Sequence, residues 1–425
     1  MSGGAIAAEV RTREADLVAL TQALVRIPTV NPPGENYRKI CELIADRLAR
    51  QGFACAFVRA EGAPGDSDRF PRWNLVARRE GAGQGRRVHF NGHIDVVEVG
   101  RDWTRDPFGG ELDNGRIYGR GTCDMKGGLA AAIVAVEAFL ALHPEFPGAI
   151  EISATGDEET GGYGGVAHLA RMGAFDGVDA VIIPEPLNKD RICLGHRGVW
   201  WAELETFGRI AHGSMPFLGD CAVRHMGAVM AEMEASLYPT LAARRTTMPV
   251  VPPAARASTL NVNSLHGGQA EPEAGFDGWP SPVVPDRCRM VIDRRFLAEE
   301  DIADVKAEFR ATVERARAAR GFRYELRDMH EVLPTLTDRD APVAAALARG
   351  VAAVLGREPD YVVSPGTYDQ KHVDRIGRLR NCVAYGPGIL DLAHQPDEYV
   401  GVEDMLDAAT VMGLALADLL GVAAG

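Results

Sequence analysis

The first 183 residues alternate between helical and strand-like patterns of hydrophobic positions. Leu17, Leu20 and Leu24 fall on one face of a helix that ends at Pro28, because hydrophobic residues three or four apart share a helical face. Further helical segments are residues 40–48, 127–142 and 164–172, and the strand-like runs are residues 54–58, 74–77, 88–91, 149–154 and 180–183. This alternation predicts an α/β fold with a mostly parallel sheet sandwiched by helices.

The pattern changes near residue 197. Strand-like runs at residues 200–207, 259–265, 289–296 and 322–329 accompany two helical segments, residues 221–237 and 299–319. The order β-α-β-β-α-β is typical of ferredoxin-like α+β units. The α/β pattern returns after residue 333, with a helix at 341–355, a strand at 381–385 and a helix at 402–420. We therefore predict one domain made of residues 1–196 and 332–425, with residues 197–331 inserted as a second domain.

Charge and composition narrow the classes of protein. The net charge of −13 argues against a surface that binds nucleic acid through its phosphates. No apolar run approaches the roughly 20 residues that span a bilayer, and residues 1–10 lack a signal-peptide pattern. The seven cysteines are widely separated, with no Cys-x-x-Cys pair, which indicates reduced thiols. We expect a cytoplasmic protein with neither nucleic acid nor membrane as a partner.

Acidic residues and histidines stand in short segments rich in glycine or flanked by proline. Three of these segments directly follow an apolar strand, and they carry His93, Glu158 and Glu185. Functional residues gather at the carboxyl ends of parallel strands. Carboxylates brought together there repel one another unless a cation neutralises them. The five segments are residues 92–95, 119–128, 156–162, 184–186 and 393–396.

The side chains in these segments suit a pair of metal ions. Zinc binds histidine nitrogen and carboxylate oxygen, and a catalytic site keeps one position open for water. Two zinc ions about 3.5 to 4 Å apart share a bridging carboxylate and a bridging hydroxide that attacks a carbonyl group. The sequence therefore favours a metal-dependent hydrolase.

Together with residues 31–34, 386–388 and 394–399, these segments are distributed over nearly the whole chain. In them the chain resembles the dinuclear zinc amidohydrolases that include acetylornithine deacetylase, succinyl-diaminopimelate desuccinylase, aminoacylase-1 and carboxypeptidase G. The resemblance implies a zinc-peptidase-like catalytic domain with an inserted ferredoxin-like domain that serves as dimerisation domain and lid. It also implies two divalent metal ions per subunit, zinc or alternatively cobalt, and a homodimer.

The resemblance assigns the metal ligands position by position. It implies that His93 and Glu185 bind one zinc ion, that Glu159 and His394 bind the other, and that Asp124 bridges the two.

Two further residues of the same segments receive roles from the resemblance. Asp95 would orient His93, since metal-bound histidines usually need a partner on their other ring nitrogen. Glu158 would act as the general base that takes a proton from water and later gives it to the leaving amine.

The resemblance also extends to residues outside the metal segments. It implies that His212 reaches across a dimer interface to stabilise the oxyanion, and that Arg295 holds the substrate carboxylate, with Arg294 as the open alternative. The remaining substrate contacts that it implies are Asn263, Thr367 and Asp369.

The loop at residues 365–372 departs from the family pattern. It carries Tyr368 and the pair Lys371 and His372, which the named members do not explain. The sequence therefore leaves the roles of these three residues open.

The expected reaction is hydrolysis of an N-acyl amide bond in a small N-acylated amino acid or related carboxylate. A dipeptidase or carboxypeptidase of the same family is the alternative, because no spacing in the sequence separates these substrates. A dimeric binding protein without catalysis is a more remote alternative.

Overall fold

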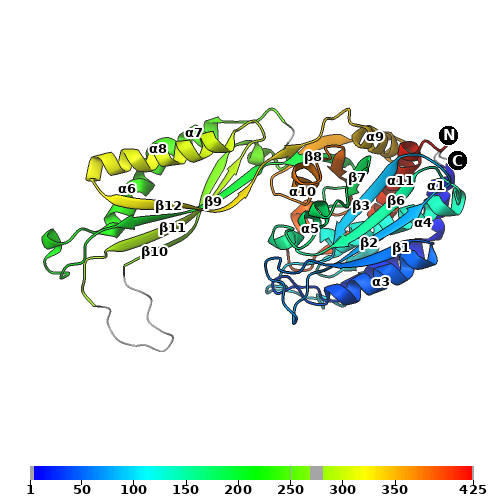
Figure 1. Cartoon of the computed structure of the whole chain (residues 1–425), viewed down its shortest axis with the longest axis horizontal. Helices are drawn as coiled ribbons and strands as arrows, with labels where there is room; N and C mark the ends of the chain where they lie inside the picture. The colour runs from blue at the N-terminus through cyan, green and yellow to red at the C-terminus, as the bar shows by residue number, and fades with distance from the viewer. Residues whose placement is uncertain (1–3, 249, 269–280, 424–425) are drawn as a thin grey trace. The chain divides into compact units, whose positions relative to one another are not determined.

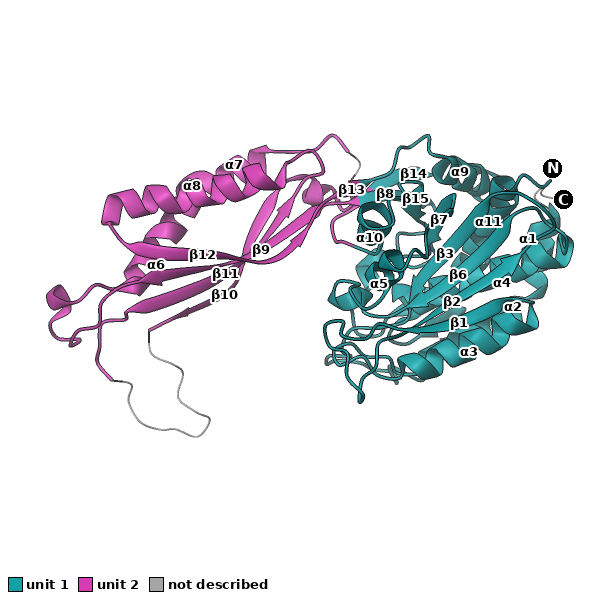
Figure 2. Cartoon of the chain, viewed as in Figure 1, with its two compact units in different colours: residues 1–195, 336–362, 368–425 teal, residues 196–335, 363–367 magenta. Residues whose placement is uncertain are grey.

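The computed structural model describes residues 4–248, 250–268 and 281–423 of the chain. The chain divides into two compact units. Unit 1 comprises residues 1–195, 336–362 and 368–425, and unit 2 comprises residues 196–335 and 363–367 (Figure 2). Unit 2 thus takes in residues 363–367, which the sequence pattern by itself assigns to the second part of the catalytic domain.

Unit 1 is built on a nine-stranded sheet with the strand order β1-β2-β6-β3-β7-β15-β8-β13, in which β14 also pairs with β8 (Figure 1). The central strands β6, β3, β7 and β15 run parallel. The strands β1 and β2 on one side and β8 on the other pair antiparallel. The sheet is therefore mixed, with its parallel part in the centre. The sequence did not predict the antiparallel strands at its edges, because hydrophobic patterns indicate strands but not their directions. The strand bounds are β1 (Ala54–Arg59), β2 (Trp73–Glu80), β3 (Arg87–His93), β6 (Ala149–Thr155), β7 (Ala180–Ile183), β8 (Arg191–His196), β13 (Thr335–Leu336), β14 (Asp360–Ser364) and β15 (Cys382–Ala384).

Helices pack against this sheet. Helices α4 and α11 contact β3, α9 contacts β7 and β15, and α3 contacts β1 and β2. A small separate sheet of unit 1 has the order β16-β5-β4. The bounds are α1 (Gly4–Thr12), α2 (Glu14–Val25), α3 (Tyr37–Arg50), α4 (Gly127–Leu142), α5 (Val166–Arg171), α9 (Pro342–Leu355), α10 (Gln370–Arg375), α11 (Val402–Leu420), β4 (Glu111–Asp113), β5 (Arg116–Tyr118) and β16 (Tyr399–Gly401).

Helix α4 forms the centre of the hydrophobic core of unit 1. The segment Thr122–Leu142 is long and apolar enough to cross a membrane, but 89% of its most apolar window is buried inside the protein. The expectation that no such apolar run exists was therefore wrong. A helix that is hydrophobic on all sides is equally suited to a large protein core, and this one packs between α1, α2, α11 and β3.

Unit 2 contains an antiparallel sheet with the order β10-β11-β9-β12. Its elements follow the predicted order β-α-β-β-α-β, and its core includes Trp200, Met226 and Phe309. The helix predicted at 221–237 forms as α6 followed directly by the π-helical turn η4, and α7 continues it to Ala243. The bounds are β9 (Gly198–Phe207), α6 (Ala222–Glu232), η4 (Met233–Leu237), α7 (Tyr238–Ala243), β10 (Thr259–Gly267), β11 (Arg287–Phe296), α8 (Ile302–Arg320) and β12 (Arg323–Val332).

Candidate metal centre

Three neighbouring parallel strands deliver predicted ligands to one edge of the sheet. His93 is the last residue of β3, and Glu159 lies in the turn η2 (Glu158–Thr160) that follows β6. Glu185 follows β7. Since β6, β3 and β7 are adjacent and parallel, their carboxyl ends lie side by side.

The other two predicted ligands come from outside these strands. Asp124 lies in the irregular turn η1 (Thr122–Lys126) directly before α4, and His394 follows the turn η6 (Leu390–Leu392). A Cβ atom at Gly128 would overlap the carbonyl oxygen of Pro184. Only glycine therefore allows the first turn of α4 to approach the segment that carries Glu185.

The structure brings all five predicted ligands together. His93 Nε2 lies 3.0 Å from Asp124 Oδ1, and His394 Nε2 lies 3.5 Å from Asp124 Oδ2. His394 Nε2 is also 3.1 Å from Glu159 Oε2, and His93 Nε2 is 3.9 Å from Glu185 Oε1. The two oxygens of Asp124 thus face different histidines, as a bridging ligand requires.

Two carboxylate oxygens in this cluster lack a partner among the described residues. Oε1 of Glu159 and Oε1 of Glu185 are buried without a hydrogen bond. Buried polar atoms are nearly always paired, so these two oxygens indicate an additional binding partner. Donor atoms of His93, Asp124 and Glu159 all lie within 4.8 Å of one another. Histidine nitrogen and carboxylate oxygen at this spacing fit divalent metal ions.

Burial and mutual hydrogen bonds shift the pKa values of the predicted ligands. Burial raises the pKa of Glu159 to about 7 and the pKa of Glu185 well above its ordinary value. Hydrogen bonds to Asp124 and Glu159 raise the pKa of His394 to about 10. Burial alone would raise the pKa of Asp124, but its hydrogen bonds to both histidines lower that pKa below its usual range. Metal binding must therefore release protons.

Asp95 supports the centre in a way that differs in part from the prediction. The nearest acceptor for His93 Nδ1 is the backbone carbonyl of Asp95 at 3.0 Å, whereas the carboxylate lies 3.6 Å away. The carboxylate accepts hydrogen bonds from the backbone N–H groups of Glu158 at 3.2 Å and Glu159 at 3.1 Å. One buried residue therefore orients a ligand histidine and also fixes the turn that carries the predicted base.

Glu398 and Arg120, which have no predicted role, hold together two predicted ligand segments that are distant in the sequence. Oε1 of Glu398 accepts hydrogen bonds from the backbone N–H groups of Gly121, Cys123 and Asp124 at 3.0, 2.9 and 3.1 Å. Its Oε2 lies 2.5 Å from Arg120 Nη1. The only sequence signal was that Arg120 lies in the segment 119–128 and Glu398 in the motif at 394–399.

Arg120 completes this connection to His394. Its Nη2 donates to the carbonyl oxygen of His394 at 3.2 Å. His394 has a backbone φ of 65°, a conformation that costs of order 1 kcal/mol or more for a residue other than glycine. The contact with Arg120 helps to hold the ligand in this conformation.

The predicted residues of unit 2 have different local settings. Arg294 is buried and lies 2.8 Å from Glu300, whereas Arg295 is part-exposed and binds Asp293 through two hydrogen bonds of 2.7 and 2.9 Å. Of the two arginines, Arg295 is therefore the accessible one. His212 is exposed, and its Nδ1 accepts a hydrogen bond from Ser214 Oγ at 2.8 Å.

Three further predicted substrate contacts are also placed by the structure. Asn263 is exposed on β10 and accepts a hydrogen bond from Asn261 at 2.8 Å. Thr367 is part-exposed and belongs to unit 2. Asp369 is buried in unit 1, where it accepts a hydrogen bond from Asn91 at 3.2 Å. Their roles toward a substrate stay predictions.

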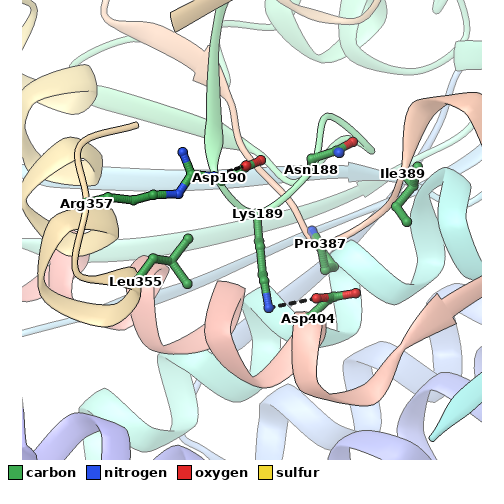
Figure 3. A pocket seen from close by; sticks show the side chains of 8 residues that line it. All are labelled: Asn188, Lys189, Asp190, Leu355, Arg357, Pro387, Ile389 and Asp404. Carbon is green, nitrogen blue, oxygen red and sulfur yellow. Dashed lines mark hydrogen bonds and ion pairs between the residues drawn. The ribbon is translucent and has the colours of Figure 1, made fainter. Parts of the chain in front are cut away.

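A separate cavity of about 340 Å³ lies elsewhere in unit 1 (Figure 3). Both of its cationic side chains are engaged, Lys189 with Asp404 at 2.8 Å and Arg357 with Asp190. None of its eight lining residues is a predicted ligand. This cavity is therefore not the predicted metal centre.

Comparisons with known proteins find a matching family and a similar named relative. Residues 89–418 match the profile of the peptidase family M20/M25/M40. The chain is 32% identical over 397 residues to the succinyl-diaminopimelate desuccinylase of Stenotrophomonas maltophilia (strain K279a), covering 91% of this chain and 94% of the relative.

Two solved structures share the fold. Human carnosine dipeptidase 1 has a TM-score of 0.76 at 20% identity, covering 99% of each chain. A dinuclear metal-binding peptidase of the M20 family from Bacillus subtilis has a TM-score of 0.67 at 15% identity, covering 96% of this chain and 98% of that one.

We expect zinc or cobalt to bind and to stabilise the folded protein. Because binding displaces protons, including the one on Glu159 with a pKa of about 7, uptake should be tighter at about pH 8 than at about pH 6. A ligand at about 100 times its dissociation constant should add about 2.7 kcal/mol to the free energy of unfolding. Metal analysis after dialysis and thermal unfolding with and without chelator measure both effects. Protein that takes up no metal at either pH contradicts this assignment.

We expect Glu398→Gln to weaken metal binding about 10- to 100-fold. The substitution removes the charge that pairs with Arg120 and weakens the hydrogen bonds to the turn of Asp124. Titration with a chromogenic chelator measures the affinity. The matched control is Glu403→Gln, because Glu403 is an exposed acid paired with Arg11; an equal loss in both variants would argue against a specific role for Glu398.

Proposed function

The chain belongs to the peptidase family M20/M25/M40, and from this premise we propose that it hydrolyses the amide bond of a small N-acylated amino acid or related carboxylate. The single observation that carries the proposal is the convergence of five ligand residues beside Glu158 in unit 1. The relative named as a desuccinylase supports a deacylase over a dipeptidase or carboxypeptidase.

The metal centre divides the work between two adjacent acids. His93, Glu185, Asp124, Glu159 and His394 would hold two divalent ions, which when bound would supply an activated water and positive charge for the developing oxyanion. The side chain of Glu159 points to His394, at 3.1 Å. The side chain of Glu158 instead points to Lys371, at 3.4 Å. Glu158 is therefore free of the ligand set and takes the proton of the attacking water, which it passes to the leaving amine.

Substrate recognition falls to residues that carry hydrogen-bonding groups and positive charge. Arg295 presents a guanidinium that suits a carboxylate, while Asn263 and Thr367 offer neutral polar groups. His212 would stabilise the oxyanion from the partner subunit of a homodimer.

The surface of unit 2 supports dimerisation. Large hydrophobic side chains are exposed in the loop at 208–220, among them Phe217 at 77%, Ile210 at 59% and Leu218 at 54%. Strand β10 is an edge strand of the sheet, and it exposes Leu265. Exposed apolar groups and an unpaired edge strand are both features of protein interfaces. All seven cysteines lie in the described part of the chain, and none of them forms a disulfide bond, which supports our proposal of a cytoplasmic location.

We expect wild-type protein loaded with zinc or cobalt to cleave N-acyl amino acids. Succinyl-, acetyl- and formyl-amino acids are compared with dipeptides, and release of a free amine is measured. Cleavage of dipeptides alone would change the assignment to a dipeptidase. Absence of any metal-dependent cleavage would favour the binding protein without catalysis.

Glu158→Gln should retain its metal but lose about 100-fold or more in kcat, because the amide cannot accept the proton of water. Glu42→Gln, at an exposed helical position paired with Arg38, should leave kcat unchanged. Metal content and steady-state kinetics check both variants. A near-normal kcat in Glu158→Gln would remove this residue from the mechanism.

Mixing two inactive variants tests whether His212 acts across a dimer. In a mixed dimer of Glu158→Gln and His212→Asn, one of the two sites keeps both residues intact if His212 acts in the partner's site. Equal mixing with subunit exchange should then restore about one quarter of wild-type activity. If His212 acts within its own subunit, the mixture stays as inactive as its components.

A further inference from the structure

We propose that Lys371 is a positioning residue that holds the carboxylate of Glu158 in place for proton transfer. Lys371 belongs to the loop whose unusual residues the family resemblance does not explain. The inference rests on the proposed function, because it concerns the reaction that Glu158 performs.

The contact between the two side chains is buried. Lys371 Nζ lies 3.4 Å from Glu158 Oε1, and the two side chains are only 4% and 11% exposed. A buried ammonium group is costly without an anionic partner. The charge of Lys371 also acts on the buried carboxyl of Asp369, where it opposes the larger effect of burial, which raises the pKa of that group to about 7. The charge of Lys371 therefore interacts with two acids beside the predicted metal centre, Glu158 and Asp369.

Neighbouring side chains, those of Gln370 and Tyr368, fix the backbone that carries Lys371. Gln370 Nε2 donates to the carbonyl oxygens of Cys382 at 2.7 Å and Leu194 at 3.0 Å. The hydroxyl of Tyr368, which is buried, donates to Gln370 Oε1. These contacts anchor the start of α10 to β15 and β8. Tyr368 contributes to this anchoring through its hydrogen bond to Gln370.

The same turn of α10 is also tied to the segment of the predicted base. His372 Nε2 donates to the carbonyl oxygen of Gly161 at 2.7 Å. Gly161 ends the turn η2, which begins with Glu158. Adjacent residues therefore hold this turn at two points: His372 at its backbone and Lys371 at the side chain of Glu158.

Positioning is needed here because neighbouring acids have opposite tasks. Glu159 must bind metal, whereas Glu158 must stay at a distance that leaves room for water. Any cation bound between His93 and His394 would attract both carboxylates. The ammonium of Lys371 supplies a competing attraction on Glu158, so that this carboxylate does not join the ligand set.

The decisive experiment separates positioning from substrate binding. Lys371→Met removes the charge but keeps a similar chain, Lys371→Gln serves as a second neutral variant, and Lys371→Arg keeps the charge. In the neutral variants we expect kcat to fall about 10- to 100-fold with KM changed less than about twofold, at unchanged metal content, and Lys371→Arg should recover part of the loss. The control Lys189→Met removes a lysine paired with Asp404 and Asp407 and should leave kcat unchanged. A rise in KM with normal kcat would overturn the proposal in favour of a substrate contact.

A double-mutant cycle shows whether Lys371 acts through Glu158. In the Glu158→Gln background, Lys371→Met should reduce the residual kcat by less than about twofold, because its partner is already absent. A further full loss of kcat would overturn the proposal.

The midpoint of thermal unfolding is measured for the same set of variants, because this quantity does not depend on activity. The two single variants should shift the unfolding midpoint by amounts whose sum differs from the shift of the double variant. Additive shifts would show that the contact does not form. If wild-type protein cleaves no amide, the proposed function fails, and the unfolding cycle still decides whether Lys371 holds Glu158.

Discussion

Repulsion among buried carboxylates is the constraint on which the centre of unit 1 depends. Asp124, Glu159 and Glu185 converge with two histidines, and two of the carboxylate oxygens have no hydrogen bond. Carboxylates taken out of water need protons or cations. The pKa values of Glu159 and Glu185 are raised, as expected for carboxyl groups that are buried beside other acids. Divalent ions bound at this centre would neutralise the same carboxylates, so the repulsion that the acids create also favours metal binding.

The surrounding polar residues hold this arrangement before metal arrives. The buried pair of Arg120 and Glu398 joins the turn of Asp124 to the segment of His394. Buried ion pairs contribute little net stability, because desolvation offsets their attraction. We therefore interpret this pair as holding residues in position, since its hydrogen bonds go to the backbone of two predicted ligands, Asp124 and His394. Asp95 likewise holds the turn of Glu158 and Glu159, through hydrogen bonds from the backbone N–H groups of both residues.

The turn after β6 shows how neighbouring residues acquire different roles. Glu158 and Glu159 have the same side chain and adjacent positions, yet one faces Lys371 and the other faces His394. The difference arises from the elements that contact the turn, because α10 contributes Lys371 to Glu158 and the segment after η6 contributes His394 to Glu159. Local sequence therefore supplies the two acids, and long-range packing decides which partner each of them contacts.

The sequence by itself determined the fold class, most elements and the candidate ligands. Helix α4 has the bounds predicted at 127–142, and β3 spans the predicted strand at 88–91, because periodic hydrophobic patterns depend only on neighbouring residues. The tertiary structure alone decided the antiparallel edges of the sheet, the use of Asp95, and the partners of Glu398 and Lys371. The partners of Glu398 and Lys371 lie more than 200 positions away along the chain, as in the contacts of Lys371 with Glu158 and of Glu398 with Cys123. No spacing along the chain records such contacts, since they form only when packing of the core brings the segments together.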